Sequence, residues 1–294
     1  MMTESVDPRF QDLDAWTPLQ ATTAIWESQL AAVAAIGPAL PDIAGAIEAA
    51  AERLGLGEGR LAYAGAGTSA RVAVQDGSEL PPTFGWPEMR VLFLTAGGEG
   101  ALSIALEGAE DDRDDALRQV EVAGLGPSDV LIGLAASGRT PFTLAALEAA
   151  RRAGALTIGM SNNPGAPILA ASDRPILVET GAEVVAGSTR MKAGTAQKVV
   201  LNMISTGIML RLGRVHAGLM VDMRPGNDKL RGRAVEMVAR IAGCSPETAE
   251  EALRRTDLNI KQAVLVARGL SPEDAAHRLR AAGGRLRDAL GEAG

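Results

Sequence analysis

Five short apolar runs constrain the fold of this chain more than any other feature of its sequence. They lie at residues 60–64, 90–95, 129–135, 155–160 and 175–179. Each run but the last leads into a turn rich in Gly, Ser or Thr and then into a stretch with helical spacing. Short strands that alternate with helices are typical of a doubly wound, mostly parallel α/β sheet. The near-continuous apolar run Val130–Leu134 also fits a strand buried on both faces.

Helices are predicted on both sides of this sheet region. The Ala-rich stretch from Pro18 to about Leu54 predicts two helices, broken near Gly37-Pro38. After about Gly226 the strand pattern stops, and residues 245–291 are predicted to form three short helices. Two of these start at Ser-Pro-Glu triplets, which place a capping Ser, a first-turn Pro and an acid where helix starts favour them. We therefore predict an amino-terminal helical segment, an α/β domain and a small carboxyl-terminal helical domain, over residues 1–50, 51–226 and 227–294.

Composition excludes several classes of protein. The 294 residues carry 36 acids against 29 bases, a net charge of −7, which argues against a nucleic-acid or membrane-surface binder. One cysteine, Cys244, and two histidines provide neither a disulfide nor a zinc cluster, so we expect no metal or cofactor. Met1–Asp7 lacks a secretory signal, and the apolar stretch Val199–Leu210 falls short of the roughly 20 residues of a membrane span. A cytoplasmic, soluble protein is expected.

The first candidate binding loop is Gly65-Ala66-Gly67-Thr68-Ser69-Ala70, between the first strand and a helix. Glycines permit a tight turn, and the N–H groups at a helix start attract an anion such as phosphate. The loop also matches a weak dinucleotide fingerprint, but the next strand ends at Leu94-Thr95 without the acid that a ribose would need. The hydroxyls of Thr68 and Ser69 suit a phosphate or a sugar better, and a purely structural turn remains the alternative.

Two further polar loops follow the same logic. Residues 136–140 place Ser137, Arg139 and Thr140 at another strand-to-helix corner, where open α/β sheets bind ligands. Residues 187–198 carry three basic residues and no acid, and lead into an apolar helix. A cationic helix start rich in Ser and Thr is again a potential anion site. For residues 136–140, the structural alternative is that Ser and Thr cap the helix and Arg139 is solvated. For residues 187–198, the alternative is a solvated helix face.

These loops resemble those of sugar isomerase (SIS) phosphosugar-binding domains. More narrowly, the chain resembles the family of N-acetylmuramic acid 6-phosphate etherases from about Leu40 to its end. Besides loop 187–198, the motifs that carry this narrower resemblance lie at residues 76–85, 107–112, 219–222 and 227–230. Three positions depart from the family pattern, one of which is Gly77, where an alanine is common. Ala70 stands where a glycine is common, and Leu80 replaces a cysteine, so no cysteine is expected to act there.

The resemblance implies an α/β sandwich, a cytoplasmic homodimer and a phosphorylated amino sugar as substrate. The implied reaction removes the D-lactyl ether of N-acetylmuramic acid 6-phosphate and yields N-acetylglucosamine 6-phosphate and D-lactate, a step of cell-wall amino sugar recycling. The family motifs place its two catalytic glutamates at Glu79 and Glu110. The implied substrate-binding residues are Gly67, Thr68, Ser69, Ser137, Arg139, Thr140, Ser188, Thr189 and Lys192.

The chemistry of an ether explains why two carboxyl groups are needed. Once the sugar opens to its aldehyde, a base can remove the hydrogen on carbon 2 while an acid protonates the departing lactyl oxygen on carbon 3. Water then adds to the enal. This elimination requires one carboxylate and one carboxylic acid at the same pH. We assign Glu79, beside Pro81-Pro82, as the acid, and Glu110, in a dense acidic run, as the base.

Other functions on the same fold remain as alternatives. A non-catalytic phosphosugar sensor that regulates a sugar kinase or transcription would need the loops but not the glutamate pair. An aldose–ketose isomerase would use a carboxylate base without that pair. A DNA-binding regulator is disfavoured, because the first 50 residues are poor in Lys and Arg and contain no basic recognition helix. The presence of both Glu79 and Glu110 favours the etherase.

Overall fold

A five-stranded parallel sheet forms the centre of the larger part of the chain. The computed structural model describes residues 1–104 and 106–292. The strand order is β2-β1-β3-β4-β5, and all four strand pairs are parallel. The strands are β1 (Leu61–Gly65), β2 (Val91–Thr95), β3 (Val130–Leu134), β4 (Leu156–Ser161) and β5 (Arg174–Leu177). The predicted α/β fold with a doubly wound parallel sheet is confirmed.

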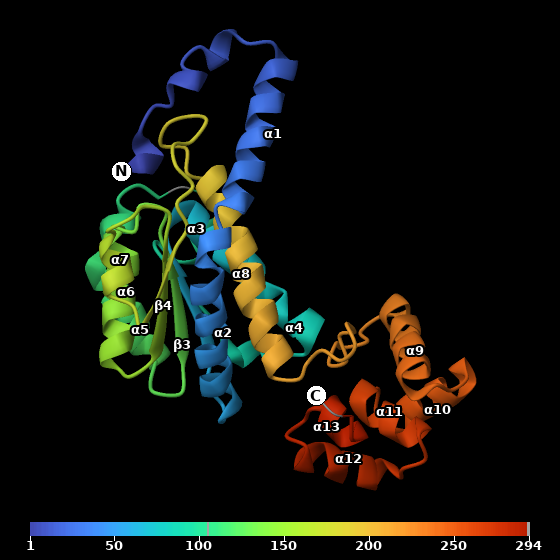
Figure 1. Ribbon diagram of the computed structural model, residues 1–294. Helices are drawn as coiled ribbons and strands as arrows, with labels where there is room; N and C mark the ends of the chain where they lie inside the picture. The colour runs from blue at the N-terminus through green and yellow to red at the C-terminus, as the bar shows by residue number, and fades with distance from the viewer. Residues whose placement is uncertain (105, 293–294) are drawn as a thin grey trace. The chain divides into compact units, whose positions relative to one another are not determined.

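Helices cover both faces of the sheet (Figure 1). One face carries α2 (Leu40–Gly55), α3 (Gly67–Ser78) and α8 (Lys192–Arg211), and the other carries α5 (Arg113–Ala123), α6 (Pro141–Arg152) and α7 (Pro167–Ala170). The core between the sheet and α5, α6 and α7 is built largely from alanines and leucines. Small side chains let the layers approach closely. At Gly133 in β3, for example, a Cβ would lie 2.6 Å from the side chain of Leu147.

The amino-terminal region consists of short 3-10 turns and one long helix. The turns are η1 (Met2–Glu4), η2 (Pro8–Phe10) and η3 (Leu13–Ala15), and α1 (Pro18–Ala34) follows. A capping box between Thr17 and Gln20 starts α1. The predicted break is confirmed, because η4 (Gly37–Ala39) separates α1 from α2.

By length and composition alone, Pro18–Gly55 is apolar enough to cross a membrane, with a mean hydropathy of 1.7 over its most apolar window. The break divides this stretch into helices of 17 and 16 residues. Each is shorter than the roughly 20 residues that a membrane span needs. In α2, moreover, the side chains of Ile43, Ala46, Ala50 and Leu54 are buried against the protein. The apolar character of α2 therefore reflects its place in the core.

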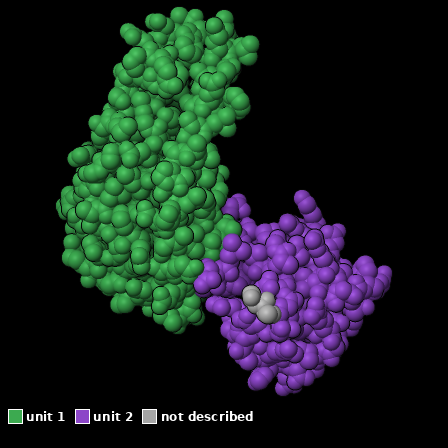
Figure 2. All heavy atoms as spheres, viewed as in Figure 1, with its two compact units in different colours: residues 1–78, 89–208 green, residues 79–88, 209–294 purple. Residues whose placement is uncertain are grey.

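Residues 79–88 and 209–294 form a second compact unit, distinct from residues 1–78 and 89–208 (Figure 2). Its helices are α4 (Leu80–Phe84), α9 (Asp228–Ala242), α10 (Pro246–Arg255), α11 (Ile260–Ala267), α12 (Pro272–Ala281) and α13 (Leu286–Leu290). Ser245 and Ser271 cap α10 and α12 as predicted. The short α13 was not among the three helices predicted for residues 245–291. The predicted domain boundaries remain a prediction, since the compact units divide the chain at other positions.

Candidate functional site

The strand order reverses between β1 and β3, and two of the predicted binding loops lie at this point. β1 and β3 are adjacent and in register, with Gly65 opposite Leu134 at their carboxyl ends. The chain leaves β1 toward β2 on one side and leaves β3 toward β4 on the other. Such a switch point opens a crevice at the carboxyl edge of a doubly wound sheet, where ligands bind. The fold therefore brings loops 65–70 and 136–140 to the same edge.

Loop 65–70 contacts loop 187–198 through small and polar groups. Gly67 begins α3 with φ at +52°, a conformation that favours glycine. A Cβ at Gly194 would lie 3.3 Å from the methyl group of Thr68. The hydroxyl of Ser69 donates a 3.0 Å hydrogen bond to Gln197 of α8 and is buried. Ser69 thus links two of the predicted loops, and its hydroxyl is left to act toward a ligand as an acceptor.

Loop 136–140 is held against the end of β4 while its polar groups face outward. Gly138 has φ at +62°, and a Cβ there would lie 2.4 Å from Ala166 and 2.6 Å from the hydroxyl of Ser161. The backbone N–H of Arg139 donates to the hydroxyl of Ser137, and the Arg139 side chain is exposed. Thr140 precedes α6 without capping it through its side chain. Ser137, Arg139 and Thr140 therefore lie between the carboxyl end of β3 and the start of α6.

The start of α8 differs from the anion site that its sequence predicts. The first two backbone amides of this helix, at Lys192 and Ala193, donate to the carboxylate of Glu183 at 2.8 and 2.9 Å. Glu183 is fully buried, so an internal carboxylate already occupies the anion position of this helix start. Sequence reasoning missed Glu183, because it lies nine residues before the helix and outside any capping motif.

The side chain of Lys192, the first residue of α8, is largely buried and bonds within the protein. Its Nζ donates to the carbonyl of Ala182, and burial lowers the pKa of its ammonium group while the charge of Glu183 opposes that shift. Lys192 lines a cavity of about 650 Å³ beside α1, which also includes Arg9 and Trp16. Arg139 instead lines a cavity of about 420 Å³. The two predicted cationic ligands thus line two different cavities.

Glu110 lies on the segment that follows β2, at the same carboxyl edge of the sheet. It belongs to the 3-10 turn η7 (Ala109–Asp111), and its side chain is exposed. The preceding turn η6 (Glu99–Leu102) is tied to α3, because the Arg71 guanidinium donates to the carbonyls of Ala101 and Leu102. Arg71, which sequence reasoning did not single out, therefore connects the Glu110 segment to the helix that follows loop 65–70.

Glu79 directly follows the carboxyl end of α3 and serves as the N-cap residue of α4. Pro81 and Pro82 stand in the first turn of this helix, because proline suits the start of a helix, where its missing N–H is not needed. The Glu79 side chain is exposed. Glu79 thus stands at a junction of two helices, which restricts its backbone.

A buried carboxylate fixes the end of α3 just before Glu79. Asp76 accepts hydrogen bonds from Tyr63 of β1 and from Asn202 and Ser205 of α8, at 3.1, 2.7 and 3.1 Å. Burial raises the pKa of Asp76, and the three hydrogen bonds oppose that shift. Asp76 therefore joins α3 to the sheet and to α8 through buried polar contacts.

The carboxyl end of α4 is anchored to the segment 214–222. Arg214 donates a 2.8 Å hydrogen bond to the carbonyl of Phe84, and its guanidinium lies 5.0 Å from the ring centroid of Trp86. Gly85 follows with φ at +59°, and a Cβ there would lie 2.2 Å from the carbonyl oxygen of Asp222. The side chain of Asp222 accepts from the buried Lys261 of α11. This chain of contacts links α4 to the carboxyl-terminal helices.

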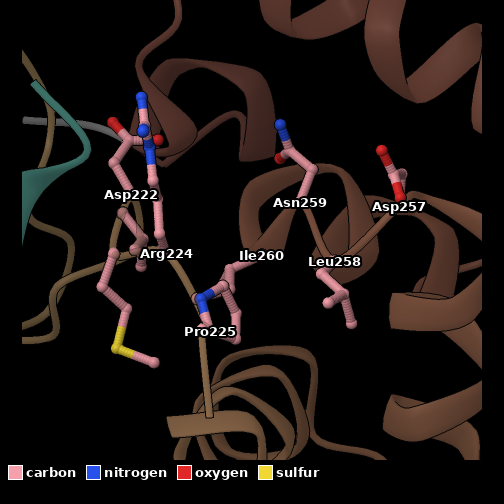
Figure 3. A pocket seen from close by; sticks show the side chains of 10 residues that line it. Asp222, Arg224, Pro225, Asp257, Leu258, Asn259 and Ile260 are labelled. Carbon is pink, nitrogen blue, oxygen red and sulfur yellow. The ribbon is translucent and has the colours of Figure 1, made fainter. Parts of the chain in front are cut away.

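Beside Asp222 lies a cavity of about 340 Å³, between residues 221–226 and 257–260 (Figure 3). Asp257 and Leu258 on its rim have positive φ values of 49° and 60°, which non-glycine residues rarely adopt. In the part of the chain that the structure describes, this cavity included, no group of three or more His, Cys, Asp or Glu side chains could hold a metal ion.

Comparison with known proteins agrees with this arrangement. Residues 112–206 match the model of the SIS domain, and residues 42–151 match the model of the glucokinase regulatory protein N-terminal SIS domain. The chain is 48% identical to the N-acetylmuramic acid 6-phosphate etherase of Deinococcus radiodurans over 99% of its own length and 95% of that protein. It is 43% identical to the etherase of Streptomyces avermitilis, over 100% and 94% of the two chains.

Solved structures support the fold. A phosphoheptose isomerase from Francisella tularensis superposes with a TM-score of 0.52 at 20% identity, over 66% of this chain and all of the other. A putative phosphosugar isomerase involved in capsule formation from Bacteroides fragilis gives a TM-score of 0.52 at 20% identity, over 69% and 99% of the two chains. At this level of identity, the likeness concerns the fold alone.

Proposed function

Because this chain belongs to the N-acetylmuramic acid 6-phosphate etherase family, we propose that it cleaves the D-lactyl ether of N-acetylmuramic acid 6-phosphate. The products are N-acetylglucosamine 6-phosphate and D-lactate. The observation that carries the proposal is identity of 43–48% over nearly the whole length of these relatives. The switch-point crevice, with hydroxyls and a guanidinium at its rim, suits a phosphosugar.

In the proposed mechanism, the loops hold the sugar and two glutamates move protons. Ser137, Arg139 and Thr140 bind the phosphate at the start of α6, where backbone amides favour an anion. Glu110 removes the hydrogen on carbon 2 of the open-chain sugar, and Glu79 protonates the departing lactyl oxygen. Water then adds to the resulting enal. Each proton transfer by a positioned side chain is worth roughly 10²- to 10⁴-fold in rate.

We further propose that the active form is a homodimer in the cytoplasm and that Glu79 acts in the site of the partner chain. Thr68 and Ser78 lie at opposite ends of α3. At about 1.5 Å per residue the two ends are roughly 15 Å apart, more than the length of one hexose phosphate. The end of α3 that directly precedes Glu79 is therefore far from Thr68 of the same chain. The exposed apolar side chains Leu19, Trp26 and Leu30 of α1 provide a surface for the association.

Mixing two inactive variants tests the shared site. One variant carries Glu79→Gln and the other Glu110→Gln, so each homodimer lacks one proton-transfer group in every site. Mixed dimers contain one site with both groups intact, and we expect D-lactate release that neither parent shows. The recovery should disappear when both parents also carry Trp26→Glu, which places charges in the apolar surface of α1. Failure of the mixture to recover activity, with mixed dimers shown by mass spectrometry, would contradict the shared site.

The reaction itself is tested by D-lactate release from N-acetylmuramic acid 6-phosphate. We expect the purified chain to release D-lactate and Arg139→Ala to raise KM at least tenfold, since a charge-assisted hydrogen bond to phosphate is worth about 1.5–3 kcal/mol. Arg152→Ala, in the last turn of α6, is the matched control and should behave as wild type. Tight binding of the sugar phosphate without any D-lactate release would instead indicate a phosphosugar sensor.

A further inference from the structure

The amino-terminal segment Met2–Ser5 lies against two of the loops assigned to the substrate. Thr3 is fully buried, although it is only a few residues from the start of the sequence. Its backbone carbonyl accepts a 3.1 Å hydrogen bond from the N–H of Gly187, the first residue of loop 187–198. Its hydroxyl accepts a 3.0 Å hydrogen bond from the side-chain amide of Asn163. A segment with no part in the sheet thus makes specific polar contacts at the carboxyl edge of the sheet.

Asn163 connects this segment to loop 136–140. Its side-chain NH2 group also donates to the carbonyl of Ala136, at 2.9 Å, and its side-chain oxygen accepts from the backbone N–H of Met2, at 2.8 Å. Asn163 is only 4% exposed. Its amide therefore uses both of its hydrogens and its oxygen inside the protein. Each of these contacts ends either on the amino-terminal segment or on the loop that carries Arg139.

The neighbouring residue makes an equivalent connection to the remaining loop. The backbone N–H of Asn162 donates to the carbonyl of Ala136, and its side-chain oxygen accepts from Gln197 at 3.4 Å. Gln197 in turn accepts from Ser69 of loop 65–70. The buried pair Asn162-Asn163 at the end of β4 is therefore the common attachment point of all three loops. Thr3 completes it, since it alone bridges Asn163 and Gly187.

We propose that Thr3, acting through Asn163, is a positioning residue of the phosphosugar site and that the amino-terminal segment forms one wall of that site. The cavity of about 420 Å³ beside Arg139 is lined by Met2, Ser5 and Asn163 together with Arg139 itself. Without the Thr3 hydroxyl, one N–H of a buried amide has no partner, and Asn163 must shift to find one. That shift moves the Ala136 carbonyl and, with it, loop 136–140. The inference rests on the proposed function of this loop.

Thr3→Val tests the inference, because valine keeps the shape of the side chain and removes only the hydroxyl. We expect KM for N-acetylmuramic acid 6-phosphate to rise roughly tenfold, with kcat within about twofold of wild type. Thr3→Ser restores the hydroxyl and should restore KM. Thr248→Val is the matched control, because the Thr248 hydroxyl is exposed and contacts the hydroxyl of Ser245 at the start of α10.

A merely structural role predicts a different pattern. A lower melting temperature of Thr3→Val with unchanged KM, or a Thr3→Ser variant as impaired as Thr3→Val, would overturn the inference. The Arg139→Ala variant separates this failure from failure of the proposed site. If Arg139→Ala raises KM and Thr3→Val does not, the result contradicts only the positioning role of Thr3. If neither changes KM, loop 136–140 does not bind the phosphate. For a chain without etherase activity, the Kd of N-acetylglucosamine 6-phosphate from calorimetry replaces KM.

Discussion

Replacing Glu79 with Gln should lower the release of D-lactate by roughly 10²- to 10⁴-fold, the usual contribution of a general acid. The amide cannot protonate the leaving oxygen, but it keeps the size and shape of the side chain. Binding of the sugar phosphate should therefore stay within about threefold of wild type, as measured by calorimetry. Glu88→Gln, another exposed acid of the segment 79–88, should retain full turnover.

The leaving group distinguishes an acid from a base at this position. A substrate whose C3 oxygen leaves as a stable phenolate needs no proton donor, so it should restore much of the turnover of Glu79→Gln. The same substrate should not restore Glu110→Gln, because removal of the carbon 2 hydrogen still requires the base. If the phenolate substrate restores the turnover of Glu110→Gln and not that of Glu79→Gln, Glu110 is the acid and Glu79 is the base. Undiminished turnover of Glu79→Gln on the natural substrate would remove Glu79 from the mechanism.

The second large effect is a loss of stability, which we expect when Lys261 is replaced with Met. The Lys261 side chain is 8% exposed, and its ammonium group donates to Asp222 and to the carbonyl of Gly284. Burial lowers the pKa of Lys261 and raises that of Asp222, and the attraction between the two charges opposes both shifts. Lys261→Met leaves Asp222 with only the more distant Arg214, at 4.0 Å. We expect the free energy of unfolding of the carboxyl-terminal helices to fall by about 3 kcal/mol, measured by urea titration.

A double variant separates the loss of the pair from the cost of an isolated charge. Replacing a buried ion pair as a whole by apolar residues is often neutral, whereas removing one partner is not. Asp222→Leu combined with Lys261→Met should therefore recover most of the lost stability. Lys229→Met, on the exposed side of α9, is the matched control and should change the free energy of unfolding by less than about 0.5 kcal/mol. A loss below about 1 kcal/mol for Lys261→Met would contradict the importance of the pair.

The strands could be predicted from the sequence because their signal is local. Each strand is a short run of apolar residues, and the three central strands are almost completely buried, as the run at Val130–Leu134 suggests. The helix starts at Ser245 and Ser271 also carry their signals within a few residues. By contrast, α13 has only five residues, and its N-cap residue Arg285 makes no side-chain capping bond. Its position depends on packing, which no short pattern encodes.

Within the candidate site, the positions of the loops were predictable and their connections were not. Glycines and hydroxyls after a strand directly mark a turn from a strand into a helix. The contact between Thr3 and Asn163, however, joins residues 160 positions apart. Neither residue belongs to a motif, and both are polar side chains that would ordinarily be exposed. The capping of α8 by Glu183 could not be predicted from the sequence for the same reason, since only the folded chain brings that carboxylate to the helix.

The Glu183 cap has a consequence for ligand binding as a whole. A helix start with open amides often becomes ordered only when its anion arrives, and part of the binding energy is then lost to that ordering. Here a buried carboxylate of the chain itself holds the first turn of α8. The first turn of α8 therefore needs no ligand to become ordered. A sugar phosphate in the proposed site would lose little binding free energy to ordering loop 187–198, so its affinity would depend on direct contacts.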